Sequence, residues 1–185
     1  EYGGTLSFAK AGEPPNPDYM VSAHGAGAFT SGVLGRLTMA DWATPRDKHD
    51  FVLHNVPTYT IGNLAESWSM PDDTTFIWNI RKGVYWDNKA PVNGREFDAY
   101  DVEWNYHRYL GLGDFTEDGP NAAVLAVHWG VEIESVTATD KWTVVIKLKE
   151  PRPGALPFFL DYAGLSIQPP EVIEQYGDMK DWRNL

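Results

Sequence analysis

Apolar and polar residues alternate on both sides of a Pro-Asp-Asp sequence at positions 71–73. Proline sets φ for a turn and aspartate hydrogen-bonds its own backbone, so this sequence is typical of a chain reversal. The flanking segments Ser67–Met70 and Thr75–Ile80 are therefore predicted to form an antiparallel hairpin. Because side chains alternate between the two faces of a strand, one face of the second segment is predicted to lie in the core: Phe76, Trp78 and Ile80.

A second alternating pattern occurs in the last third of the chain. The segments Val131–Val136 and Trp142–Leu148 flank the polar sequence Thr139-Asp140-Lys141 and are predicted to form another hairpin. Its second strand has the half-buried pattern of an antiparallel sheet with one face toward the core. The residues of that apolar face are Trp142, Val144, Ile146 and Leu148.

A helix is predicted to begin at Asp98, since aspartate is a favoured N-cap residue. Asp101 then lies where an acidic side chain meets the positive end of the helix dipole, and Gly111 suits the helix end. The two aspartates could also be a catalytic carboxylate pair, but capping is the favoured interpretation. Weaker patterns predict a strand at Thr5–Ala9 and short helices at Phe29–Leu37 and Phe158–Leu160.

The order of these segments resembles one family. Between Leu64 and Val102 the chain contains LAESW, PDDTTFIWNIRKGV, YWDNKAP and FDAYDV in succession. This is similar to the signature region of the family 5 solute-binding proteins of ABC importers, the extracytoplasmic receptors for peptides, nickel and some sugars. Further along, VEIESVTATDKWTVVIKLKEPRPGALPFFL and SIQPPEVIEQYG resemble the hairpin and the strand with short helix that follow in this family.

Strands in hairpins with helices packed on them indicate an α+β protein. The resemblance implies the amino-terminal portion of a periplasmic-binding-protein-like, type II, two-lobed receptor, with mixed or antiparallel sheets and flanking helices. Such receptors are usually several hundred residues long, so we expect this chain of 185 residues to lack the second lobe. The expected parts are the first strand and cleft loop of lobe I at 1–38, an inserted β-rich subdomain with the family signature at 39–150, and a return segment to lobe I at 151–185.

Composition and motifs argue against several kinds of binding site and catalytic site. The net charge of -11 argues against nucleic acid, because phosphate binding needs clustered Lys and Arg. The absence of cysteine excludes disulfides and thiolate metal sites. The five histidines lack a paired metal-binding spacing, and neither a nucleophile elbow nor a phosphate-binding glycine loop is present. We therefore predict no catalytic residues, no metal site and no cofactor.

The resemblance also implies where solute is held. In the family, the loop after a D-P motif lines the cleft, and in some members its backbone pairs with an extended peptide. Asn16-Pro17 takes the place of that motif here, although a simple flexible connection is the alternative for the loop that follows. The family also has an aromatic contact after the signature helix. The residues nominated for solute binding are therefore Val21, Ser22, Ala23, His24 and Phe115.

The function implied by the resemblance is that of the extracytoplasmic solute-binding component of an ABC importer for oligopeptides or dipeptides, and not that of an enzyme. We expect a monomer, periplasmic or anchored at the cell surface, that delivers its ligand to the membrane permease subunits. No apolar run approaches the length of a membrane span. The opening residues EYGGTLSF lack the basic start and apolar middle of a signal peptide, so any export signal is expected upstream.

The alternative is a carbohydrate-binding module or a glycosidase fragment, because eight tryptophans could supply rings on which sugars stack. A glycosidase also needs two carboxylates facing the scissile bond, and the acidic residues of the two hairpins show no such pairing. An exposed row of Trp78, Trp86 and Trp142 would favour glycan binding. Burial of those rings would favour the receptor.

Overall fold

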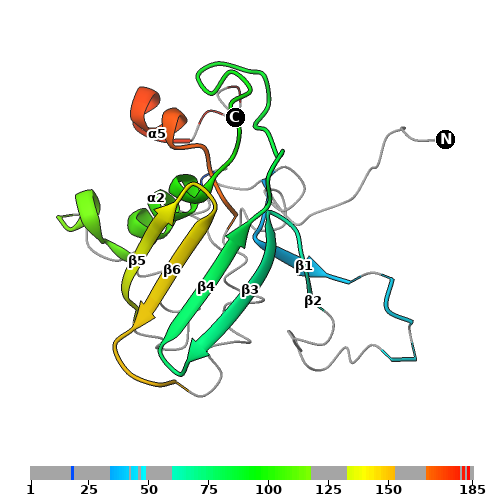
Figure 1. The fold of residues 1–185 in the computed structure, drawn as a ribbon. Coiled ribbons are helices and arrows are strands. Elements are labelled where there is room, and N and C mark those ends of the chain that lie inside the picture. The colour runs from blue at the N-terminus through cyan, green and yellow to red at the C-terminus, as the bar shows by residue number, and fades with distance from the viewer. Residues whose placement is uncertain are drawn as a thin grey trace, which may run out of the picture.

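The computed structural model describes residues 18, 34–41, 43–45, 47–48, 60–117, 133–152, 166–179, 181 and 183. Strands β3, β4, β6 and β5 form one antiparallel sheet in that spatial order, and β1 pairs with β2 in a separate ribbon beside it (Figure 1). The elements in chain order are β1 (Thr38–Ala40), β2 (Thr60–Gly62), β3 (Ala65–Asp72), β4 (Thr75–Ile80), α2 (Ala99–Leu110), the 3-10 helix η2 (Gly113–Phe115), β5 (Ile133–Asp140), β6 (Thr143–Leu148) and α5 (Pro170–Tyr176).

The first predicted hairpin is confirmed as β3 and β4. Strand β3 continues through Asp72, so the reversal is made by Asp73 and Thr74 and starts later than the Pro-Asp-Asp sequence suggested. The Asp72 carboxylate accepts hydrogen bonds from the Thr75 hydroxyl (2.7 Å) and from the Thr74 backbone N–H and hydroxyl (both 2.9 Å). These bonds, that from Thr75 foremost, lower the pKa of Asp72 to about 2.

The second predicted hairpin is confirmed as β5 and β6. Strand β5 extends to Asp140, beyond the predicted end at Val136, and the turn consists of Lys141 and Trp142. The Asp140 carboxylate stabilises this turn by accepting a hydrogen bond from the Trp142 backbone N–H (2.7 Å). Strand β6 also pairs with β4, which joins the two hairpins into one sheet.

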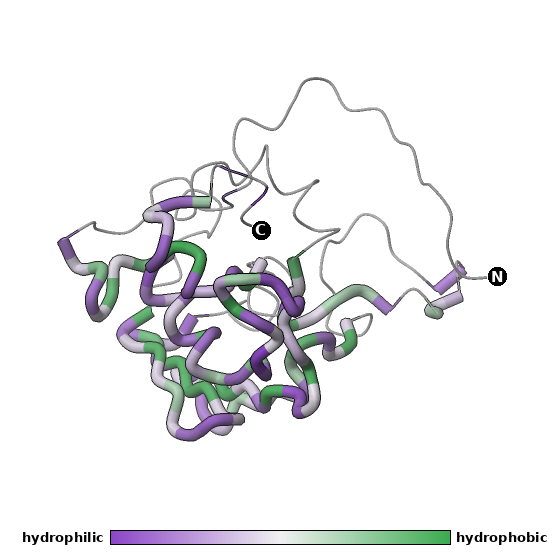
Figure 2. Tube along the Cα trace, turned by 90° about the horizontal axis from the view of Figure 1, so that it is seen from above, coloured by the Kyte–Doolittle hydropathy of each residue, from purple (hydrophilic) through white to green (hydrophobic). Residues whose placement is uncertain are grey.

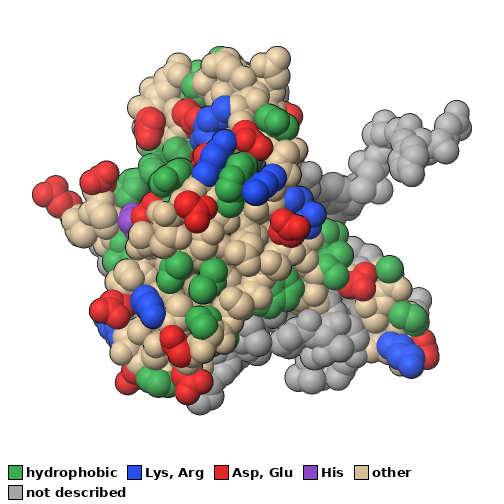
Figure 3. Space-filling view, viewed as in Figure 1, with side chains coloured by type: hydrophobic (Ala, Val, Ile, Leu, Met, Phe, Trp, Pro, Cys, Tyr) green, Lys and Arg blue, Asp and Glu red, His purple; other side chains and the backbone are tan. Residues whose placement is uncertain are grey.

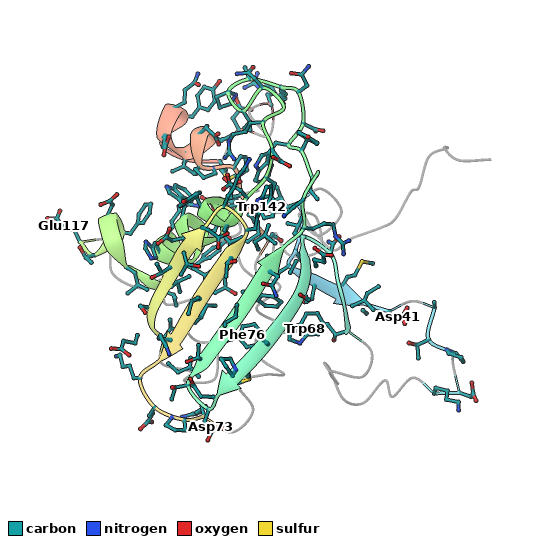
Figure 4. The ribbon with its side chains drawn as sticks, viewed as in Figure 1. Asp41, Trp68, Asp73, Phe76, Glu117 and Trp142 are labelled. Carbon is teal, nitrogen blue, oxygen red and sulfur yellow. The ribbon has the colours of Figure 1, made fainter. Side chains whose placement is uncertain are left out.

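The predicted apolar faces meet in one core. Helix α2 packs against β5 and β6, and its buried residues join those of the strands. The Trp78 ring contacts the rings of Phe76 and Trp68 edge to face, with centroid distances of 4.7 and 5.9 Å. Figure 4 shows Trp68 and Phe76 on β3 and β4, with Trp142 toward α2, and Figure 2 shows apolar and polar residues alternating along the trace. The largest core side chains include Phe76, Trp78, Ile80, Phe97, Tyr106, Tyr109 and Ile146, whereas Trp142 is half-buried.

Helix α2 begins and ends where the sequence predicts. The Asp98 carboxylate accepts a hydrogen bond from the Tyr100 N–H (3.0 Å), and the Asp101 carboxylate accepts one from the Asp98 N–H (3.1 Å). This arrangement is a capping box, so both aspartates act in helix initiation as predicted. Gly111 ends the helix with a left-handed φ of 65°, and its N–H bonds the His107 carbonyl.

The helix predicted at Phe29–Leu37 is wrong in its last four residues, which the structure describes and which are not helical. The Gly35 carbonyl accepts a hydrogen bond from the Ile167 N–H (2.9 Å), and the Leu37 carbonyl accepts one from Ala65 (3.0 Å). These carbonyls bond distant segments, so tertiary contacts replace the local pattern. The strand predicted at Thr5–Ala9 and the helix predicted at Phe158–Leu160 lie outside the described residues.

Candidate functional site

A buried ion pair joins the start of the chain to helix α2. Asp18 is fully buried, and Arg108 is 12% exposed. The Arg108 guanidinium donates two hydrogen bonds to the carboxylate, from Nη2 to Oδ2 (2.7 Å) and from Nη1 to Oδ1 (3.3 Å). This two-bond geometry fixes the orientation of both groups and offsets part of the cost of burying their charges.

Gln168 and Asn105 complete the surroundings of this ion pair. The Gln168 side chain accepts a hydrogen bond from Arg108 Nη1 (2.8 Å) and donates one to Asp18 Oδ1 (3.2 Å). The Asn105 side chain forms two hydrogen bonds with the Gln168 backbone. Asn105 Nδ2 donates to the Gln168 carbonyl (2.8 Å), and the Gln168 N–H donates to Asn105 Oδ1 (3.0 Å). Three segments that are distant in the chain are therefore held together around Asp18.

An aromatic pair also lies close to Arg108. The rings of Trp104 and Phe115 meet edge to face at 89°, with 5.3 Å between their centroids. The Arg108 guanidinium carbon is 5.9 Å from the centroid of the Trp104 ring, within the range of a cation–π contact. Arg108 thus connects Asp18 to an aromatic cluster at the C-terminal end of α2.

The structure places only one of the nominated solute-binding residues. Phe115 is half-buried in η2, while the residues 21–24 lie outside the described part of the chain. The nearest described residue is Asp18, three positions before Val21. Sequence reasoning missed Asp18, Arg108 and Gln168, because a contact across 90 positions leaves no signal in local spacing. The one available clue was that Asp18 directly follows Asn16-Pro17.

The three tryptophans named above for glycan binding do not form an exposed row. Trp78 is fully buried, and Trp86 and Trp142 are half-buried. Lys141 and Lys82 lie over the Trp142 ring, with Nζ 4.9 and 5.6 Å from its centroid. Asp73, at the tip of the first hairpin, lies at the opposite end of the sheet from Trp142 (Figure 4). The geometry therefore favours the receptor interpretation.

Within the described ranges, no group of His, Asp and Glu side chains is arranged to hold a metal ion. Among the described side chains on the face shown in Figure 3, acidic and basic groups are intermixed. Across the same described ranges, every helix is too short or too polar to cross a membrane.

Known proteins share this sequence and architecture. The family model described as bacterial extracellular solute-binding proteins, family 5, middle region, matches residues 60–184. A Brucella ovis protein named as an ABC transporter peptide-binding protein is 30% identical over 109 residues, which are 58% of this chain and 17% of that protein. The matched region is thus a minor part of its relative.

Two solved structures show the same fold. Haemophilus influenzae OppA in complex with RPPGFSPFR has a TM-score of 0.66 at 22% identity, covering 93% of this chain and 32% of that one. The periplasmic binding protein DppA from Helicobacter pylori in complex with the peptide STSA has a TM-score of 0.64 at 23% identity, covering 91% and 32%. The α+β fold of a periplasmic binding protein, expected from the sequence, is confirmed, and this chain spans about a third of each structure.

Proposed function

Because the chain belongs to the family 5 bacterial extracellular solute-binding proteins, we propose that the protein containing it captures oligopeptides or dipeptides outside the cytoplasm for an ABC importer. Binding is non-covalent, and the loaded receptor delivers its ligand to the membrane permease subunits. The match of the family to residues 60–184 carries this proposal. The peptide class is supported by the name of the Brucella ovis relative.

We place the solute-facing edge at residues 21–24, with Phe115 as an aromatic contact. An extended peptide can add to an exposed backbone segment as an extra strand, which gives affinity without reading side chains. The buried Asp18–Arg108 pair supports this placement, since only three peptide bonds separate Asp18 from Val21. An anchored entry point reduces the conformational entropy that the edge loses on binding peptide.

We also propose that the segments 1–38 and 151–185 belong to lobe I and that 39–150 is a subdomain inserted in it. Two ion pairs connect these parts, Arg108 to Asp18 and Arg95 to Glu171. Such links favour movement of this portion as one body when a two-lobed receptor closes around solute by a hinge. The receptor is proposed to act as a monomer.

Native mass spectrometry of the full-length protein, purified from an exported preparation, tests this function. A co-purified ladder of short peptides is the expected result. Detection of a nickel complex or an oligosaccharide would support the receptor function but change the class of ligand. A ligand-free protein that cleaves glycans would overturn the proposal.

A further inference from the structure

A cavity of about 220 Å³ opens between the loop that follows β4 and the segment that enters α5. These two segments lie at the same end of the four-stranded sheet in Figure 1. Among the described residues, neither Asp18 nor Phe115 lines this cavity. Most of the lining is apolar and includes Leu64, Val84, Trp86, Pro91, Phe97 and Val172.

Hydrogen bonds hold the aromatic residues that line the cavity in place. The Trp86 indole donates from Nε1 to the Asp101 carboxylate (3.2 Å), which satisfies its polar atom and leaves the ring as a wall. Trp86 meets Phe97 edge to face, with 5.9 Å between centroids. The Phe97 N–H bonds the Val84 carbonyl (2.9 Å), so three wall residues are fixed relative to one another.

Arg95 holds the two sides of the cavity together. Its guanidinium bonds both oxygens of Asp101, at 2.8 and 2.5 Å, and also both oxygens of Glu171 in the first turn of α5. Burial tends to raise the pKa of Glu171, but the hydrogen bonds from Arg95 hold it below its usual value. The next residue, Val172, lines the cavity from α5. The ion pairs of Arg95 with Asp101 and Glu171 therefore fix the spacing between α5 and the loop.

From this volume and these fixed rings, we propose that the cavity is an accessory binding site for a small molecule that presents one aromatic ring. An apolar cavity of about 150 Å³ is large enough to take benzene. Aromatic walls also favour an inserted ring, which they can meet edge to face. The charged lining residues Asp87 and Lys89 are exposed, so an uncharged polar substituent placed beside them would meet water.

Ligand-observed fluorine NMR of the full-length protein with 4-fluorobenzyl alcohol tests this site. Saturable line broadening is expected. Val92→Phe places a ring in the cavity and should weaken binding at least tenfold, provided that its circular dichroism and melting curve match the parent protein. The control is Tyr176→Ala on α5, at an exposed residue outside the lining, which should leave the titration unchanged.

A crystal soaked with 4-bromobenzyl alcohol gives a test that does not depend on any variant. An anomalous bromine peak between Trp86 and Pro91 would support the site. Absence of saturable broadening, unchanged binding to a folded Val92→Phe protein, bromine density elsewhere only, or another segment of the full-length chain filling the cavity would each overturn it.

Discussion

Arg108 and Asp18 form a buried ion pair across 90 positions of the chain, with 2.7 Å between Nη2 and Oδ2. Arg108 also approaches the Trp104 ring, which packs on the nominated Phe115. One side chain of α2 therefore contacts both Asp18 and the ring pair that contains Phe115. This makes the pair the most informative target for stability and for binding.

Arg108→Ala should lower the free energy of unfolding by about 3–5 kcal/mol, because it removes the guanidinium that pairs with the fully buried Asp18 carboxylate. Urea unfolding at pH 7 measures this change. Arg183→Ala is the matched control, since it breaks an ion pair with Asp181 in which Arg183 is 72% exposed, and it should have little effect. Equal losses for the two variants would contradict a special role for the buried pair.

Asp18→Asn should weaken peptide binding by the full-length protein about tenfold, which is about 1.4 kcal/mol. The substitution keeps the size of the side chain but removes the charge that Arg108 holds, so the residues that follow are less well positioned. Isothermal titration with the peptide found by mass spectrometry is the measurement, at a temperature where the variant is folded. Arg183→Ala, which removes the exposed ion pair with Asp181, should leave the affinity unchanged. Full affinity of the Asp18→Asn protein would count against the proposed edge.

The Asp72 carboxylate should make the hairpin more stable at neutral than at strongly acidic pH. Its pKa falls from 3.8 to about 2 on folding, so its contribution is present above pH 3.8 and is lost as pH falls through about 2. Asp72→Asn should therefore lower Tm at pH 7 and bring the curves of variant and parent together below pH 2. Ser69→Ala is the control, because it removes an exposed hydroxyl from the same hairpin. A constant difference in Tm from pH 7 to pH 2 would refute this assignment.

Gly113 and Gly83 provide a matched pair of left-handed glycines, with φ of 55° and 73°. A Cβ added at Gly113 would lie 2.7 Å from His107 Nδ1, whereas one at Gly83 meets nothing within 4 Å. Gly83→Ala should thus cost only the backbone strain, about 1 kcal/mol, and Gly113→Ala about 2–3 kcal/mol. Urea unfolding compares the two.

His107 supplies a second measurement for the Gly113 variant. In the parent protein its Nε2 is 2.8 Å from the Val136 carbonyl, a contact that ties α2 to β5. Displacement of the ring should change the NMR signals of His107 and Val136 in the Gly113→Ala protein and not in the Gly83→Ala protein. Equal stability losses without such a change would show that the crowding is relieved at no cost.

The predictions from sequence succeeded where the controlling interactions are local. Asp98, Asp101 and Gly111 define the ends of α2 through bonds to residues within four positions. The two hairpins depend on turn residues and on the period of two in their strands. The ordered series of motifs likewise identified the family, which the match to residues 60–184 confirms.

Prediction from sequence was wrong, or gave no answer, where a backbone group has several possible hydrogen-bond partners. At Leu34–Leu37 the apolar pattern suggested a helix, but the Gly35 and Leu37 carbonyls bond Ile167 and Ala65 instead. Similarly, alternation alone does not reveal that β4 pairs with β6 after the intervening helix. At such positions, hydrogen bonds and burial provided by distant segments outweigh the local secondary-structure propensity.

By itself, then, the sequence determined the local elements, the caps and turns, and the family, because each depends on neighbours a few residues apart or on the order of motifs. Only the tertiary structure decided that Asp18 is buried against Arg108, that Arg95 clamps α5 to the start of α2, and that a cavity lies beside Trp86. Contacts of this kind are selected by the energy of the whole packed chain, since a buried charge or ring is stable only where folding brings its partner.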